Sequence, residues 1–216
     1  RRDGRRAHAV ERLAAHHDQG HGDRHLQRRR HAVHTSHATP ASVYSRSADR
    51  DWEKDNDIPA DQLAGGCKDI ALQLAEASFD VALGGGTSVF YGKNGGGRRS
   101  DPAADLPAAW AAKNGGVVVK DAAALWAAPV EQAERKPDSA EPTLTDMTAA
   151  AIARLKADPD GFYLMVEGGR IDHAHHAGQA GFALEEAAEF ARAVQYAVDN
   201  TDPAETLIMV TADHSH

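Results

Sequence analysis

The chain of 216 residues lacks several features that would define common protein classes. Its one cysteine, Cys67, excludes an internal disulfide framework and a cysteine-rich zinc finger, so any metal site must use histidine and carboxylate ligands. It has no run of about 18 apolar residues that would span a membrane, and its start has no apolar stretch typical of a secretory signal. Acidic residues outnumber basic ones by 32 to 24, and the formal net charge of -8 argues weakly against a nucleic acid as partner, although the charge is unevenly spread along the chain.

What remains is typical of a globular α/β protein, with 42% hydrophobic and 26% charged residues. Residues 1–36 differ, since they hold nine Arg, no Lys and seven of the 13 His without a period of two or 3.6. This segment is either a basic arm for nucleic acid or out-of-frame, non-native sequence. We predict that it is disordered or non-native and lies outside the folded domain, which then covers residues 37–216.

From residue 37 onward, short apolar runs alternate with segments of helical spacing, which indicates an α/β fold. Thr143 and Asp146 have the spacing of a capping box and mark the start of one helix. The pattern predicts further helices over 60–77 and 178–198, and strands over 79–83, 117–119, 162–166 and 207–211.

Two clusters of acidic and histidine residues follow the last two predicted strands, at the position where ligands bind in open α/β sheets. The cluster VEGGRIDHAHH contains Glu167, Asp172 and His176, and the i,i+4 pair of Asp172 and His176 shares one helix face. The cluster TADHSH contributes Asp213 and His214 from a turn. Each cluster alone also fits helix caps and solvated surface residues. Together, their oxygen and nitrogen donors suit zinc and magnesium, and indicate a multi-metal hydrolase.

At these residues the chain resembles the alkaline phosphatase family. The resemblance runs from His37 to His216, through HATPASVYSRSADRDWE, GCKDIA, DVALGGG, FYLMVEGGRIDHAHHAG and TADHSH. It implies a central, mostly parallel sheet flanked by helices, here incomplete, so that 37–216 is a partial domain. It also implies hydrolysis of phosphate monoesters at two zinc ions and one magnesium ion through a phosphoserine intermediate, a homodimer, and a periplasmic or extracellular location.

The resemblance also assigns roles to residues. The matched ligands are Asp172 and His176 for one zinc, Asp213 and His214 for the other zinc, and Thr39 and Glu167 for magnesium.

By the same resemblance, Arg50 matches the arginine that binds the phosphate in this family. The planar fork of an arginine can donate two parallel hydrogen bonds to phosphate oxygens. Without the resemblance, Arg50 would be an ordinary surface charge. His37 matches a variable position near the magnesium, and His173 matches one beside the substrate.

The chain departs from the family pattern at two points. The family's nucleophile lies in an Asp-Ser-Ala motif before the HATP segment, whereas the same letters here, with Ser139 as the serine, come long after it. A further histidine zinc ligand would follow TADHSH. We therefore expect a fragment without the serine nucleophile that is inactive or weakly active. A noncatalytic metal-binding remnant, a related phosphodiesterase, sulfatase or phosphoglycerate mutase, and a nucleic-acid-binding protein that uses the basic arm remain alternatives.

Overall fold

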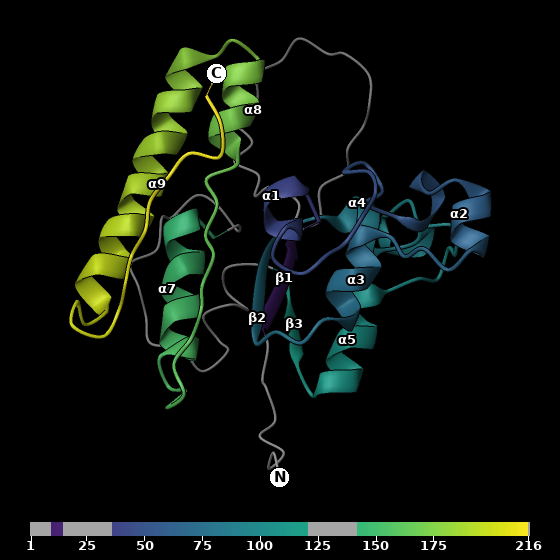
Figure 1. Cartoon of the computed structure of the whole chain (residues 1–216), viewed down its shortest axis with the longest axis horizontal. Coiled ribbons are helices and arrows are strands. Elements are labelled where there is room, and N and C mark those ends of the chain that lie inside the picture. Colours follow the sequence, from purple (N-terminus) through teal and green to yellow (C-terminus); the bar gives the residue numbers. More distant parts are fainter. Residues whose placement is uncertain (1–9, 15–35, 121–141, 216) are drawn as a thin grey trace. The chain divides into compact units, whose positions relative to one another are not determined.

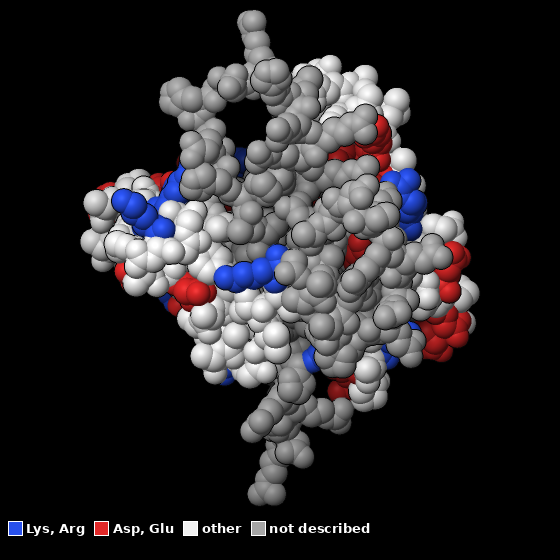
Figure 2. Space-filling model, turned by 180° about the vertical axis from the view of Figure 1, so that it is seen from behind, with Lys and Arg blue, Asp and Glu red and all other residues white. Residues whose placement is uncertain are grey.

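The computed structural model describes residues 10–14, 36–120 and 142–215. The chain divides into two compact units, which we call unit 1 (Arg1–Lys120) and unit 2 (Asp121–His216) and describe one at a time. Among the described residues, no helix is long and apolar enough to cross a membrane. On the face shown in Figure 2, acidic and basic side chains are interspersed.

Unit 1 contains a parallel three-stranded sheet (Figure 1). The strands are β1 (Val10–Ala14), β2 (Val81–Gly85) and β3 (Val117–Val119), in the order β2-β1-β3. Val10 lies opposite Val81 on one side and Val117 on the other. The predicted strand at 117–119 is confirmed, and the strand predicted at 79–83 begins two residues later.

Strand β1 lies inside the Arg- and His-rich segment and pairs with β2 and β3. Its sequence, VERLA, has no clear alternation. Pairing in a parallel sheet uses backbone groups, which any non-proline sequence supplies, and therefore leaves little trace in the side-chain pattern. The remainder of residues 1–35 lies outside the described part, and the domain boundary stays a prediction.

Seven short helices complete the described part of unit 1. In chain order they are α1 (Ala38–Ala41), η1 (Asp55–Asp57), α2 (Ala60–Ala64), α3 (Ile70–Glu76), α4 (Thr87–Phe90), η2 (Lys93–Gly95) and α5 (Leu106–Asn114). The prediction of a single helix over 60–77 was wrong, because this range contains two separate helices, α2 and α3. The chain leaves α2 at Gly65, and Gly66 has φ 95°, a conformation that glycine adopts at little cost. Asp69 then begins α3 by accepting a hydrogen bond from the Leu72 amide.

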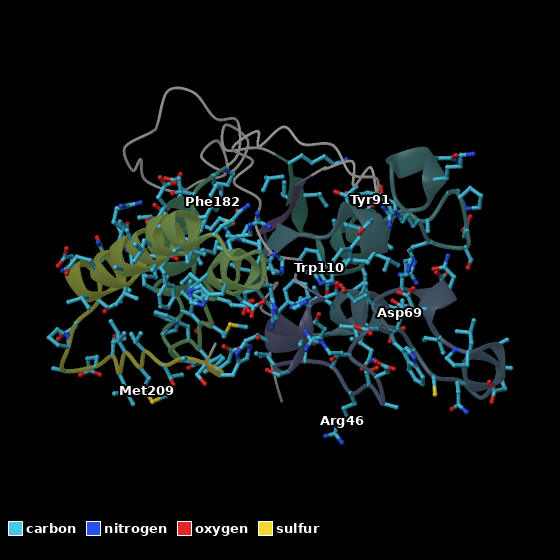
Figure 3. The ribbon with its side chains drawn as sticks, turned by 90° about the horizontal axis from the view of Figure 1, so that it is seen from above. Arg46, Asp69, Tyr91, Trp110, Phe182 and Met209 are labelled. Atoms are coloured by element: carbon cyan, nitrogen blue, oxygen red, sulfur yellow. The ribbon has the colours of Figure 1, made fainter. Side chains whose placement is uncertain are left out.

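The core of unit 1 surrounds α3 and α4. Its buried residues are Ala71, Leu74, Val89, Phe90 and Tyr91, with Tyr44, Phe79 and Leu106 packed against them. Trp110 is 1% exposed and stacks on Phe79, with ring centroids 5.0 Å apart. Figure 3 labels Tyr91 and Trp110 in this part of the chain.

A buried ion pair joins α3 to the glycine-rich loop after η2. The guanidinium of Arg99 donates to both carboxylate oxygens of Asp69, at 3.0 and 2.7 Å, and also to the Val89 carbonyl oxygen at 2.9 Å. Both side chains are at most 5% exposed. Because the pair is bidentate and Asp69 also caps α3, each charge is compensated although it is shielded from water.

The described part of unit 2 contains the helices α7 (Leu144–Leu155), α8 (Arg170–His176) and α9 (Ala180–Asn200). Helix α9 runs alongside both α7 and α8 (Figure 1). The predicted capping box at Thr143 and Asp146 is confirmed, and α9 begins and ends two residues after the bounds predicted for it.

The two strands predicted in unit 2 were wrong. Residues 162–166 and 207–211 form no strand, and several of their apolar side chains face solvent: Tyr163 is 74% exposed, Leu207 80% and Met209 79%. A strand forms only where a neighbour pairs with its backbone, and the described residues of unit 2 contain no strand. The two clusters therefore follow extended segments and not the strands of a sheet.

Candidate metal centre

Helix α8 carries three of the predicted site residues. Its N-cap is Gly169, and the preceding Gly168 lies close to α9, since an added Cβ there would be 3.2 Å from the Phe190 ring. Asp172 and His176 occupy one face of α8, with Asp172 Oδ1 3.4 Å from His176 Nε2. Asp172 is 28% exposed and His176 is 69% exposed. The predicted shared face is present.

The C-terminal segment brings the second cluster to the same carboxylate. After α9, this segment turns back toward α8 (Figure 1). His214 Nε2 lies 3.6 Å from Asp172 Oδ1 and 3.4 Å from Asp213 Oδ2. Two clusters that are separated in sequence by all of α9 thus meet within unit 2, with Asp172 between the two imidazoles.

The donor chemistry of this group fits zinc. Two ligands of a tetrahedral zinc ion with bonds of about 2.0–2.1 Å lie roughly 3.3 Å apart. This is close to the 3.4 Å found both between Asp172 and His176 and between Asp213 and His214. However, within the described parts of the chain, no three or more His, Cys, Asp or Glu side chains are grouped so that they could hold one metal ion. The described residues therefore supply pairs of ligands and not a closed site.

The two predicted magnesium ligands belong to different units. Thr39 is the second residue of α1, and its carbonyl oxygen accepts a hydrogen bond from Ser42 Oγ at 2.7 Å. Glu167 lies in the extended segment before α8 and is partly buried. Each is placed within its own unit, so the structure does not join them into one site.

The predicted phosphate-binding arginine lies against His37. The Arg50 side chain is exposed, and one of its guanidinium nitrogens, Nη2, is 3.4 Å from His37 Nε2. A guanidinium only donates hydrogen bonds, so His37 Nε2 accepts in this contact. His37 is also the N-cap of α1, two residues before Thr39. Unit 1 therefore brings together the predicted phosphate ligand and two residues predicted around magnesium.

Sequence reasoning missed two polar contacts in unit 2. On α8, Arg170 Nη1 lies 3.1 Å from His173 Nδ1, at an i,i+3 spacing that could have indicated the pair. On α9, Glu189 accepts hydrogen bonds from the Thr145 amide at 3.1 Å and the Thr145 hydroxyl at 2.8 Å, and also binds Arg192. No local pattern predicts the contact with Thr145, because it spans 44 residues.

The environment of Glu189 lowers its pKa. Burial by itself would raise the pKa of this carboxyl group. The hydrogen bonds from the Thr145 amide, from Arg192 and from the hydroxyls of Thr145 and Thr143 favour the charged form and together outweigh burial. The Glu189 carboxylate thus links α9 to the first turn of α7 by hydrogen bonds, and the helix dipole at this end of α7 also favours a negative charge.

The DSA sequence with Ser139 lies in residues 121–141, outside the described part of the chain, so the structure does not place this serine.

The comparison with known proteins agrees with this constellation of histidine and carboxylate residues. The family model described as "Alkaline phosphatase" matches residues 31–216. The chain therefore belongs to the alkaline phosphatase family.

Curated relatives give the same result. The chain is 41% identical over 214 residues to the tissue-nonspecific isozyme of alkaline phosphatase from Gallus gallus. The aligned region covers 84% of this chain and 41% of that protein. It is 39% identical over 213 residues to an alkaline phosphatase from Gadus morhua, with 84% and 44% covered. It is 38% identical over 213 residues to the human tissue-nonspecific isozyme, with 84% and 40% covered. The chain thus spans about two fifths of the length of these relatives.

Proposed function

We propose that this chain is the part of a phosphate monoester hydrolase that carries ligands for two zinc ions and one magnesium ion. The family match over residues 31–216 is the observation that supports this function most strongly. The relatives are named alkaline phosphatases, and the chain corresponds to about two fifths of each. On this proposal, the complete enzyme has the family's homodimeric state, its central mostly parallel sheet and its location outside the cytoplasm.

The proposed zinc ligands are the two pairs in unit 2. Asp172 and His176 hold one zinc, and Asp213 and His214 hold the other. The short distances that link Asp172 to His176 and His214 support two neighbouring ions, because ligands of ions a few ångströms apart must themselves be neighbours. Thr39 and Glu167 are the proposed magnesium ligands, since hydroxyl and carboxylate oxygens suit this hard cation.

Arg50 is the proposed phosphate ligand of unit 1. Its exposed guanidinium can present two parallel N–H groups to two phosphate oxygens, a geometry that lysine cannot reproduce. The contact with His37 holds the side chain beside α1, where Thr39 lies. Zinc, when bound, supplies charge neutralisation at the attacking and leaving oxygens of phosphoryl transfer. The chain's own contribution is to bind and orient the phosphate.

A noncatalytic metal-binding role is the second candidate function. It is favoured by the finding that the described residues supply only pairs of ligands, whereas a catalytic zinc usually has three protein ligands. On both proposals, this chain alone turns over phosphate monoesters slowly or not at all.

Both candidate functions require the chain to bind zinc, and titration calorimetry with zinc tests whether it does. The test variant replaces Asp172, His176, Asp213 and His214 with Ala, and we expect it to lose zinc binding. The matched control is His175→Ala, which removes an exposed histidine from the same helix. Equal zinc affinity in the quadruple variant and the wild-type chain would refute the proposed sites.

Activity is measured on the zinc- and magnesium-loaded chain with a chromogenic phosphate monoester, beside Ser139→Ala. Zinc binding without turnover supports a ligand-bearing part that is not itself an enzyme. Rapid turnover that Ser139→Ala abolishes would instead make Ser139 the nucleophile.

A further inference from the structure

We propose that Arg170 is a positioning residue that fixes the imidazole of His173 as a hydrogen-bond donor and keeps it from becoming a zinc ligand. The proposal rests on the proposed function, because it assigns His173 to the phosphate and not to the metal. It concerns a residue to which neither the family pattern nor the sequence motifs assign a role.

Two side chains of α8, Arg170 and His173, are in contact. The two residues are one helical turn apart, and the distance from Arg170 Nη1 to His173 Nδ1 is 3.1 Å. The contact is partly buried. A guanidinium carries five N–H donors, has no acceptor and does not lose its proton in proteins. His173 Nδ1 must therefore be the acceptor. A neutral imidazole has one ring proton, so this proton is on Nε2.

The guanidinium is itself held in place. Arg170 is partly buried, and its Nε is a buried donor without a hydrogen-bond partner in the described part of the chain. Leaving a buried donor without a hydrogen bond is unfavourable. An arginine side chain that was free to rotate would therefore turn this nitrogen toward water. Packing thus constrains the Arg170 side chain in the orientation in which its Nη1 contacts His173.

The histidines of α8 therefore have different roles: His176 is a proposed zinc ligand, and His173 is not. A histidine binds zinc through a ring nitrogen that carries no proton. In His173 that nitrogen, Nδ1, already accepts from Arg170. For Nε2 to bind zinc, the proton would have to move to Nδ1, where it would face a guanidinium N–H. His176 differs, since its Nε2 lies 3.4 Å from Asp172 Oδ1 on the face that carries the proposed ligands.

A protonated Nε2 gives His173 the chemistry needed beside a phosphate. The N–H group donates to an anionic oxygen, and the neighbouring guanidinium adds positive potential without itself having to reach the ligand. Arg170 therefore acts through His173, and we do not count it among the residues that touch the substrate.

The first test is nitrogen-15 NMR of the metal-free chain, with the His173 signals assigned from a His173→Gln variant. We expect an unprotonated Nδ1, a protonated Nε2 and a scalar coupling across the hydrogen bond between Arg170 Nη and His173 Nδ1. Arg170→Met should abolish the coupling, whereas Arg170→Lys should keep Nδ1 as an acceptor through its ammonium. A protonated Nδ1 in the wild-type chain would overturn the proposal.

The second test adds zinc to the same samples. The wild-type chain should show zinc-dependent shifts of the His176 ring nitrogens, while His173 Nε2 keeps its proton. In Arg170→Met, the Nδ1 of His173 no longer accepts from a guanidinium, so the ring proton can move to Nδ1 and the Nε2 signal should respond to zinc. Loss of the Nε2 proton of wild-type His173 on zinc binding would contradict the assignment even if the metal-free coupling is present.

The two proposals fail in different ways. If zinc shifts no histidine but the coupling to Arg170 is present, the metal sites are refuted and the role of Arg170 in fixing the ring is supported. If zinc binds His176 but His173 shows no coupling, the metal sites stand and the role of Arg170 is refuted. For a zinc-loaded chain, inorganic phosphate should bind roughly tenfold more weakly to Arg170→Met, with recovery in Arg170→Lys, while zinc affinity does not fall.

Discussion

Units 1 and 2 are stabilised in different ways. Unit 1 has a buried aromatic core, a sheet and a buried ion pair that ties a glycine-rich loop to α3. The described part of unit 2 contains three helices. The extended segments before α8 and after α9 expose large apolar side chains. Among the described residues, the largest fully buried side chains, such as Trp110 and Phe90, lie in unit 1. The proposed zinc ligands lie in unit 2 and are partly or fully exposed, so the two sets can be changed separately.

The strongest test of this difference is removal of one partner of the buried pair in unit 1. Arg99→Met leaves the Asp69 carboxylate buried without its charge partner and should destabilise unit 1 by about 3–5 kcal/mol. The exposed pair of Lys68 and Glu76 offers a matched control, and Lys68→Met should cost at most about 1 kcal/mol. Chemical unfolding followed by tryptophan fluorescence measures both. Similar losses for the two variants would show that burial does not distinguish the pairs.

The glycine-rich loop of unit 1 provides the next largest effect. A Cβ at Gly97 would lie 1.9 Å from the Tyr91 carbonyl oxygen, a backbone atom that cannot turn away. Gly97→Ala should therefore cost about 2–3 kcal/mol.

Gly96→Ala is the control, since a Cβ there meets nothing within 4 Å and the cost comes only from its φ of 81°. We expect roughly 1 kcal/mol for it in the same unfolding experiment. Equal costs at the two positions would mean that the close approach to Tyr91 is absent in solution.

In unit 2, Glu189 should make stability depend on pH. Its folded-state pKa is lowered, so its contribution is fully present above its unfolded value, 4.5, and is lost as pH falls through the lower folded value. Glu189→Gln should destabilise unit 2 at neutral pH by about 1 kcal/mol and reduce the loss of stability on acidification. Amide hydrogen exchange in α7 and α9 measures both. Glu185→Gln, at an exposed position of α9, is the control with the same charge change.

An unchanged acid response in Glu189→Gln would mean that the hydrogen bonds to Thr145 do not hold the first turn of α7.

The smallest effect should come from the exposed C-terminal segment. Met209 is 79% exposed, and Figure 3 places it on this segment. Met209→Gln should change stability by no more than about 0.5 kcal/mol. Met147, at 8% exposure in α7, is the matched control, and Met147→Gln should cost about 2–4 kcal/mol. A large loss at Met209 would support the buried strand that the sequence predicted.

The sequence predicts features that depend on neighbouring residues better than features that depend on distant ones. The capping box of Thr143 and Asp146 and the shared face of Asp172 and His176 each lie within one helical turn, and both are present. The break between α2 and α3 was also local, and Gly65 and Gly66 could have indicated it.

Distant partners explain what could not be predicted. The pair of Asp69 and Arg99 spans 30 residues, and strand β1 forms against β2 and β3 although its own pattern is weak. Residues 162–166 and 207–211 have the composition of strands, but in the described part of unit 2 no strand pairs with them. The ligand clusters were recognisable from residue type and spacing, whereas their meeting at Asp172 depends on the path of the chain after α9.

Zinc binding to Asp172→Asn measures the central claim most directly. In the wild-type chain, Asp172 Oδ1 lies between His176 and His214 and connects the two proposed ligand pairs. Asparagine keeps the size of the side chain but removes the charge that balances the metal, so calorimetry should show zinc affinity lowered by at least roughly tenfold. Unchanged zinc affinity and stoichiometry in Asp172→Asn would contradict the account.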